Sequence, residues 1–160
     1  MRTLQTLAQF LTVLSCGLFA GAAVYITLVE HPARMECGTE LAATEFRPSY
    51  RRAAVMQASL AAVGFVCSLA GWLAEHRWGW LLGGILLVAV IPFTLLAVRP
   101  TNTQLLDPSL DRGSEQARQL LLRWGRLHSV RSTLSMFFAH GFFEFAHPKI
   151  ILAGLGFPRV

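Results

Sequence analysis

Trp124, His128 and Arg131 are the residues of this 160-residue sequence whose types and spacing best suit chemistry. Successive separations of four and three residues place them within about 60° of one another on one face of an α-helix. An imidazole exchanges a proton near neutral pH, and the guanidinium beside it is a permanent cation. We therefore take His128 and Arg131 as candidate catalytic residues and Trp124 as a candidate substrate-binding residue.

The other residues of this helix indicate which of its faces is buried. Apolar side chains share the Trp124 face: Ala117, Leu120, Leu121 and Leu127. Polar side chains take the opposite face: Arg118, Gln119, Arg123, Arg126 and Ser129. A charged group on a buried face is costly unless it is paired or hydrated, which makes it a functional candidate. The alternative is structural, with Arg131 reaching a lipid phosphate and His128 capping a neighbouring carbonyl.

Three polar residues near two other helix ends complete the candidate site. Alternating spans bring Glu30, His31 and Asn102 to the same mouth of the bundle as His128. We predict that Glu30 pairs with Arg131, since an unpaired charge inside a membrane costs at least a few kcal/mol. Glu30 and Asn102 are therefore candidate catalytic residues, and His31 is a candidate for substrate binding. A polar ring that merely ends the helices is the alternative.

A metal site is a weaker hypothesis. Glu144 and His147 form a Glu-x-x-His pair one turn after His140, a spacing that ligates metal in some four-helix bundles. A di-iron carboxylate site needs a second such pair, which the sequence lacks, so interfacial polar residues are the favoured interpretation. A mononuclear site using His31 and His128 has only two evident nitrogen ligands. Metal ligands and cofactors stay undetermined at this point.

The elements that must position these residues are membrane helices. Three runs contain no Asp, Glu, Lys, Arg or His: Thr3 to Val29, Ala53 to Ala74 and Trp78 to Val98. About 20 helical residues cross the ~30 Å hydrocarbon core of a bilayer, and backbone inside lipid must satisfy its own hydrogen bonds. A fourth, more polar span covers Ser132 to Phe143. The sequence predicts an all-α integral membrane protein, a bundle of four transmembrane helices.

The ends of the first two helices are expected at prolines and charged residues. The first helix runs from about Leu4 to Val29 and ends before Pro32, because proline lacks the N–H that continues a helix. A solvated loop from Ala33 to Arg52 follows, and the second helix covers about Arg51 to Ala74. Gly64, Ser68 and Gly71 give this second helix a small-residue face for close packing.

Helix ends and turns in the second half of the chain are predicted from the same kinds of residue. Glu75 to Arg77 is a tight turn, and the third helix, kinked at Pro92, ends at Arg99 and Pro100. Asp107 to Gly113 has turn composition, and Ser114 and Glu115 mark a helix start that leads to about Phe145. Residues 1–147 form one four-helix domain and residues 148–160 a C-terminal tail.

Composition and topology limit the functional classes. Hydrophobic residues make up 54% of the chain, and the net charge of +5 arises mainly from arginines that flank the helices. These arginines indicate head-group contacts and put the two longer loops in the cytoplasm, and no nucleic-acid partner is expected. Three cysteines without a C-x-x-C pair argue against a dithiol oxidoreductase. The apolar run continues beyond a signal-peptide h-region, so we expect an uncleaved first helix.

Three short motifs resemble the anthrone oxygenase-like family of small four-span membrane proteins. They are Val29-Glu30-His31-Pro32-Ala33-Arg34, Pro100-Thr101-Asn102-x-x-Leu105 and Trp124-x-x-x-His128-x-x-Arg131, and the resemblance covers about Gln5 to Phe145. Fungal relatives oxidise anthrones to anthraquinones with dioxygen and are described as needing no obvious cofactor. By this resemblance His128 would remove the methylene proton, Arg131 or Asn102 would stabilise the oxyanion, and Trp124 would stack on the substrate.

The resemblance implies an integral, multi-pass membrane oxidoreductase that acts on a small aromatic or lipophilic substrate with dioxygen. The bilayer and a small lipophilic molecule are then the expected partners, and a homo-oligomer stays open. The alternative is a non-catalytic membrane subunit, or a binder of lipid, quinone or metal. A transporter is disfavoured, because four spans without a broken-helix pair offer little midplane charge.

Overall fold

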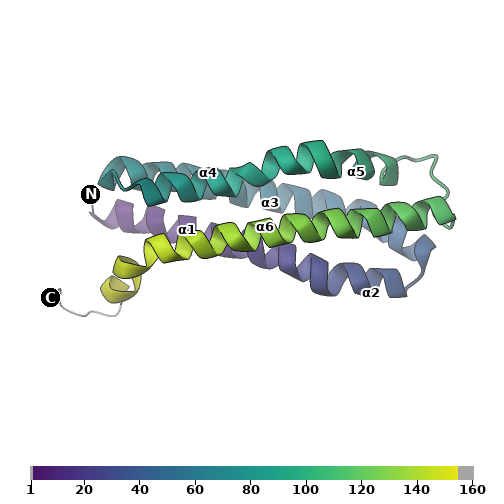
Figure 1. The fold of residues 1–160 in the computed structure, drawn as a ribbon, viewed down its shortest axis with the longest axis horizontal. Coiled ribbons are helices and arrows are strands. Elements are labelled where there is room, and N and C mark those ends of the chain that lie inside the picture. The colour runs from purple at the N-terminus through teal and green to yellow at the C-terminus, as the bar shows by residue number, and fades with distance from the viewer. Residues whose placement is uncertain (1, 155–160) are drawn as a thin grey trace.

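A computed structural model describes the backbone of residues 2–154 and the side chains of residues 3–137 and 139. The described chain forms four long helical segments that run side by side as an elongated bundle (Figure 1). The first segment joins α1 (Arg2–Tyr25), the π-helical turn η1 (Ile26–Glu30) and α2 (His31–Glu36). The second is α3 (Thr39–Glu75), the third joins α4 (Trp78–Phe93), η2 (Thr94–Val98) and α5 (Arg99–Leu105), and the fourth is α6 (Glu115–Gly154).

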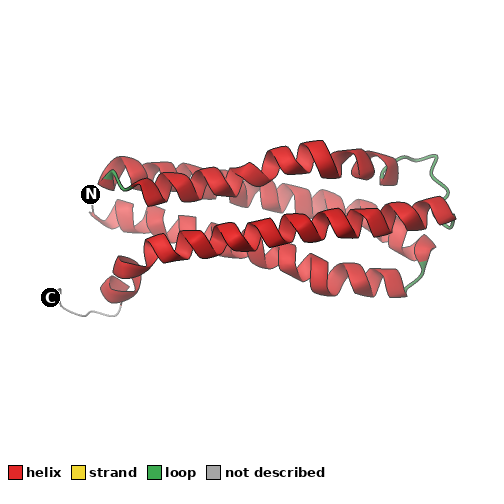
Figure 2. Ribbon diagram, in the orientation of Figure 1, coloured by secondary structure: helices red, strands yellow, loops and turns green. Residues whose placement is uncertain are grey.

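The all-α fold class is confirmed, and helix accounts for nearly the whole bundle (Figure 2). Among the residues that the structure describes, three helices are long and apolar enough to cross a membrane by length and composition: Thr3–Glu36, Thr39–Glu75 and Trp78–Leu105. Their outward side chains are apolar, for example Leu28 at 70% exposure and Leu96 at 81%. Such surfaces suit lipid contact and are compatible with a membrane protein. The start of α1 and the end of α6 lie at the same end of the bundle (Figure 1).

The predicted helix ends at Pro32 and Pro100 are wrong. In both places the helix continues beyond the proline, and a five-residue π-helical turn precedes it: η1 before Pro32 and η2 before Pro100. Proline lacks a backbone N–H and its ring crowds the preceding turn. A wider π turn changes the hydrogen-bond register there, so the helix accommodates the ring without ending.

The predicted loop from Ala33 to Arg52 is also wrong, because most of it is helix. α2 ends at Glu36, Gly38 takes a φ of +90° in the connection, and α3 begins at Thr39 rather than at Arg51. Ala42, Ala43 and Phe46 are at most 3% exposed and pack into the core. Their spacing of three and four residues is that of an amphipathic helix whose other face carries the charges.

The predicted turn and the small-residue face are confirmed. His76 takes a left-handed conformation (φ +52°) between α3 and α4. Beside this turn the two helices pack closely: a Cβ on Gly64 would collide with Leu87, and a Cβ on Gly84 would collide with Ser68. Small residues thus let α3 and α4 approach each other near the turn.

The long connection and the start of the fourth helix are also as expected. Hydrogen bonds from the side chain and backbone of Ser109 lower the pKa of the Asp107 carboxyl. Ser114 Oγ accepts a hydrogen bond from the Ala117 N–H at 3.1 Å, which caps the first turn of α6. The helix continues to Gly154, beyond the expected end near Phe145.

Candidate functional site

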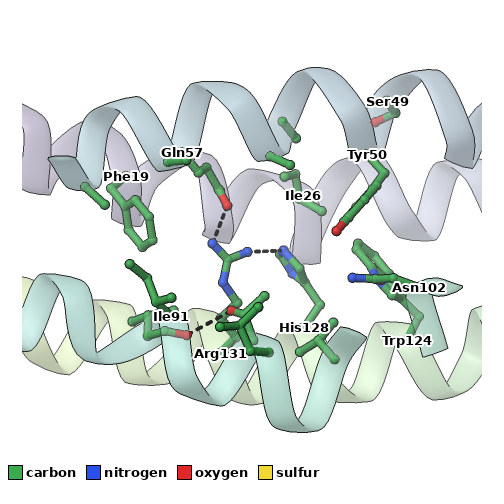
Figure 3. Close-up of a pocket in the computed structure, with 18 of the residues that line it drawn as sticks. Phe19, Ile26, Ser49, Tyr50, Gln57, Ile91, Asn102, Trp124, His128 and Arg131 are labelled. Atoms are coloured by element: carbon green, nitrogen blue, oxygen red, sulfur yellow. Dashed lines mark hydrogen bonds between the residues drawn. The ribbon is translucent and has the colours of Figure 1, made fainter. Parts of the chain in front are cut away.

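A cavity of about 420 Å³ lies inside the bundle, with walls from all four helical segments (Figure 3). Its lining is mostly apolar, and the polar side chains are few: Glu30, Arg34, Ser49, Tyr50, Gln57, Thr94, Asn102, Trp124, His128 and Arg131. A largely apolar pocket of this size with a few placed polar groups is typical of a small-molecule site. Five of the six predicted site residues line the cavity: Glu30, Asn102, Trp124, His128 and Arg131.

Arg131 extends into the middle of the cavity from α6 (Figure 3). One terminal nitrogen of its guanidinium donates to the amide oxygen of Gln57 on α3, and the other lies 3.3 Å from His128 Nε2. The guanidinium carbon lies 5.3 Å from the centre of the Phe19 ring. Arg131 Nε and Gln57 Nε2 are buried without a hydrogen-bond partner. The cation is therefore held in place while part of its donor capacity stays unused.

The hydrogen bonds of His128 define its tautomer. A guanidinium has donors only, so Nε2 accepts from Arg131 and the ring proton lies on Nδ1. Nδ1 is 3.0 Å from Thr27 Oγ1 and 3.3 Å from Ser132 Oγ, either of which can accept that proton. The imidazole is neutral, 3% exposed, and directs its basic nitrogen towards Arg131 and the cavity.

Trp124 is the centre of an aromatic cluster at one end of the cavity. Its ring stacks on His128 with centroids 4.7 Å apart and packs edge-on against Phe46 at 5.2 Å. The His31 ring centroid lies 5.2 Å from that of Trp124, but His31 does not line the cavity. His31 thus supports Trp124 in this structure instead of lining the predicted substrate site.

Asn102 on α5 is 2% exposed and lines the cavity, and neither its amide nitrogen nor its amide oxygen has a hydrogen-bond partner. Trp124 also lines the cavity, and its Nε1 is buried without a hydrogen-bond partner. A buried polar group with no partner costs about 1–3 kcal/mol. Such groups at a cavity wall are typical of a site whose hydrogen bonds are completed by a ligand.

The predicted pairing of Glu30 with Arg131 is wrong. Glu30 forms an ion pair with Arg34 and accepts a hydrogen bond from Ser49 Oγ at 2.5 Å. Arg34 also pairs with Glu45 on α3. Because the helix continues through Pro32, Arg34 lies one turn beyond Glu30 and is its nearest cation. Arg131 finds Gln57 and His128 instead.

Two residues at the cavity wall were not among the predicted site residues. Gln57 is 5% exposed and Arg34 is 7% exposed, so both are buried in the bundle. Gln57 is the one amide within the charge-free run from Ala53 to Ala74, which is the signal that could have identified it. Glu30 and Arg34 are four residues apart, which is the spacing of an ion pair on one helix, and this spacing could have identified Arg34.

No group of three or more His, Cys, Asp or Glu side chains close enough to hold a metal ion occurs among the side chains that the structure describes. His31 and His128 both contact the Trp124 ring. The predicted Glu144, His147 and His140 cluster lies on the α6 backbone, but these side chains fall outside the described residues.

The cavity opens sideways between α3 and the α4–η2 segment. Several lining residues at this opening are exposed on the outer surface of the bundle: Ala58, Ala62, Val66, Ile91 and Leu95. The exposed lining residues lie on α3 between Ala58 and Val66 and on α4 and η2 between Ile91 and Leu95. An apolar molecule can therefore reach Arg131 and His128 from the apolar exterior.

Comparison with known proteins identifies relatives of this chain. Residues 46–139, which include Asn102, Trp124, His128 and Arg131, match the anthrone oxygenase family. The chain is 28% identical over 123 residues to the anthrone oxygenase gedH of Aspergillus terreus, covering 70% of this chain and 81% of that protein. It is also 28% identical to an anthrone oxygenase of Claviceps purpurea, covering 77% of this chain and 79% of that protein.

A third relative extends the match over most of the bundle. The anthrone oxygenase AgnL2 of Paecilomyces divaricatus is 28% identical over 148 residues, which is 82% of this chain and 90% of that protein. No solved structure matches the chain. The matched segment covers more than half of the sequence and contains the polar residues of the cavity wall other than Glu30 and Arg34. This chain belongs to the anthrone oxygenase family.

Proposed function

We propose that this protein is a membrane-embedded oxygenase that converts an anthrone-type aromatic into the corresponding quinone with dioxygen, in the cavity between its helices. The observation that carries the proposal is the contact of neutral His128 with the Arg131 cation at the wall of an otherwise apolar cavity. Membership of the anthrone oxygenase family supports the reaction class. The apolar lining suits a flat, lipophilic substrate.

The first step is removal of a proton from the methylene carbon opposite the anthrone carbonyl. His128 Nε2 accepts this proton when the substrate displaces its contact with Arg131. The electron pair of the broken C–H bond moves into the ring system and places negative charge on the carbonyl oxygen. Arg131 then stabilises this oxyanion, and a cation acts most strongly in a water-poor cavity.

The second step uses dioxygen as the oxidant. The electron-rich carbanion transfers an electron to dioxygen, and the two radicals combine to form a C–O bond. The proton held by His128 completes the hydroperoxide. Loss of the remaining hydrogen at that carbon and cleavage of the O–O bond give a second carbonyl and one water molecule. One anthrone and one dioxygen thus yield one quinone and one water.

The apolar helices and the exposed apolar residues of the cavity support placing this protein in a membrane. Three helices have the length and apolar composition to cross a bilayer, and the cavity opens on their outer, apolar surface. A lipophilic anthrone partitions into the bilayer and can enter the cavity between α3 and η2 without crossing water. We propose that α6 provides a fourth crossing, because it runs along the bundle beside the other three helical segments (Figure 1).

The decisive experiment compares His128→Asn with wild-type protein in lipid nanodiscs supplied with a hydroxylated anthrone. Asparagine can still hydrogen-bond Thr27 or Ser132 but lacks the nitrogen that faces Arg131. We expect dioxygen uptake and quinone formation to fall by at least about 10²-fold, the usual range for loss of a general base. Empty nanodiscs correct for spontaneous oxidation, and His76→Asn at the α3–α4 turn is the matched histidine control.

An undiminished rate in His128→Asn would show that His128 is not the base. If wild-type protein forms quinone no faster than empty nanodiscs do but binds the quinone tightly, the protein is a quinone-binding subunit and not an oxygenase. The same apolar cavity suits that second function, so binding and turnover are measured on one preparation.

A further inference from the structure

We infer that Thr27 and Ser132 are positioning residues for the reaction: their hydroxyl groups form a one-way hydrogen-bond chain that keeps the proton of neutral His128 on Nδ1. The inference rests on the proposed function, because it explains how Nε2 stays available as the base. It assigns a role to a polar cluster between α1 and α6 that lies outside the cavity lining.

The chain begins at the His128 ring and ends at backbone carbonyl groups. His128 Nδ1 lies 3.0 Å from Thr27 Oγ1, and Thr27 Oγ1 lies 2.8 Å from Ser132 Oγ. Ser132 Oγ lies 2.9 Å from the carbonyl oxygen of Ala23 on α1 and 2.9 Å from that of His128 itself. These are ordinary hydrogen-bond distances, so two hydroxyl groups connect the imidazole to the backbone.

The carbonyl groups give the chain its direction. A carbonyl oxygen can only accept, and a hydroxyl group has one proton to donate. Ser132 donates its proton to a carbonyl, so its oxygen accepts the proton of Thr27. Within the part of the chain that the structure describes, the other hydrogen-bond partner of Thr27 Oγ1 is His128 Nδ1. Thr27 can only accept there, which requires a proton on Nδ1.

The opposite side of the ring imposes the same tautomer while the cavity is empty. Arg131 donates towards His128 Nε2 at 3.3 Å, and a guanidinium cannot accept. In the proposed reaction Arg131 turns to the substrate oxygen, so this contact is lost at the step that needs the base. Neutral histidine in water prefers its proton on Nε2. At that step the less common tautomer therefore depends on Thr27 and Ser132.

The position of the chain in the bundle suits this role. Thr27 belongs to the π turn η1, and π turns inside α-helices frequently occur at functional sites. Ser132 is 4% exposed, and neither hydroxyl side chain lines the cavity. A substrate that enters the cavity therefore leaves the chain intact.

Nitrogen-15 NMR of the imidazole rings tests the tautomer without any turnover. Protonated and bare ring nitrogens resonate far apart, and the signals that disappear in His128→Asn belong to His128. The samples are nanodiscs that contain protein labelled at histidine. We expect wild-type His128 to have a protonated Nδ1 and a bare Nε2.

Arg131→Met isolates the hydroxyl chain, because it removes the donor on the other side of the ring. We expect His128 to keep its proton on Nδ1 in this variant. Adding Ser132→Ala frees the Thr27 proton to bond Nδ1, so the His128 proton should move to Nε2 in most molecules. A proton on Nε2 in Arg131→Met alone, or the same tautomer with and without Ser132→Ala, would overturn the inference.

Thr12→Val is the matched control for both measurements. Thr12 is a threonine of α1 that is 2% exposed, and its hydroxyl donates to the carbonyl oxygen of Ala8, far along the helix from His128. Adding Thr12→Val to Arg131→Met should leave the tautomer unchanged.

Turnover of an anthrone in nanodiscs is the second measurement. Thr27→Val keeps the shape of the side chain but removes its hydroxyl. We expect kcat to fall about tenfold, the effect of one lost hydrogen bond, and KM to stay the same. Thr27→Ser should recover most of the wild-type rate, and Thr12→Val should keep all of it. An undiminished kcat in Thr27→Val would overturn the positioning role.

The two measurements separate this inference from the proposed reaction. The expected tautomers in a protein that does not oxidise anthrones would support the chain and overturn the reaction. Normal anthrone oxidation by a wild-type protein whose His128 proton lies on Nε2 in Arg131→Met would overturn the chain and leave the proposed function standing.

Discussion

The Arg131 guanidinium on α6 donates a hydrogen bond to the amide oxygen of Gln57 on α3, across 74 residues of sequence. Gln57 is neutral, so it orients the cation without cancelling its charge. Arg131 can therefore act on a negative charge that develops in the cavity, and a carboxylate partner would remove much of this capacity.

Gln57→Glu tests this relationship directly. A carboxylate at the same place would form an ion pair with Arg131 and weaken its attraction for the substrate oxyanion. We expect kcat for anthrone oxidation to fall by about 10²-fold, the cost of losing one oxyanion contact, while the protein stays folded. The measurement is dioxygen uptake in nanodiscs, with thermal unfolding of the same samples.

Gln116→Glu is the matched control, because it adds the same charge at an exposed position near the start of α6. It should leave kcat unchanged. If Gln57→Glu also keeps the wild-type rate, the charge of Arg131 takes no part in the reaction.

The lateral opening predicts how substrate reaches the site. Ala62 on α3 is exposed and lines the opening between α3 and η2. Ala62→Trp should narrow this opening and slow both association and dissociation of a quinone by about tenfold, with a smaller change in Kd. Stopped-flow binding in nanodiscs measures both rates.

Ala70→Trp provides the control, because Ala70 is exposed on the same helix but away from the cavity. Unchanged rates in Ala62→Trp would place the route for the ligand elsewhere, whereas slowed rates in both variants would indicate a general effect on α3.

The helical class and the buried face of α6 could be predicted from the sequence, because both depend on local composition and periodicity. Trp124 and His128 are buried as the spacing indicates, while Arg118 and Arg123 are exposed. The helix ends at Pro32 and Pro100 could not be predicted in this way. Whether a proline ends a helix or is accommodated by a π turn depends on the packing of the turns around it, which is a tertiary property.

The partners of the charged residues were the least predictable part of the site. Charge alone suggested a Glu30–Arg131 pair, but the continued helix brings Arg34 within one turn of Glu30. An error in one helix boundary thus became an error in an ion pair. Gln57 was not among the predicted site residues, because an amide in an apolar run does not reveal its partner on another helix.

Arg34 should contribute mainly to stability. Its side chain is 4% exposed and pairs with Glu30 and Glu45, which are 27% and 51% exposed. Arg34→Met should lower the free energy of unfolding by about 3 kcal/mol, because it leaves the half-buried Glu30 without its cation. Arg51→Met, at an exposed position on α3, should change it by less than about 1 kcal/mol. Equal effects in denaturant titrations would show that the Arg34 ion pairs are not stabilising.

Gly125 on α6 should be essential for the position of the His31 ring. A Cβ at this glycine would overlap His31 Nε2 and lie 2.7 Å from Cδ2, so Gly125→Ala must push the ring away from Trp124. We expect a loss of about 1–3 kcal/mol from overpacking, together with weaker quinone binding as Trp124 loses its support. Thermal unfolding and calorimetric titration measure the two effects.

Gly21→Ala and the double variant His31→Ala/Gly125→Ala separate this contact from a general effect of alanine. No atom lies within 4 Å of the Cβ position at Gly21, so alanine there should stabilise the helix by roughly 0.5–1 kcal/mol. Gly125→Ala should gain a similar amount once His31 is reduced to alanine, because the collision is gone and only the helix preference remains. A loss of stability that is equal with and without the His31 ring would mean that another neighbour of Gly125 requires the glycine.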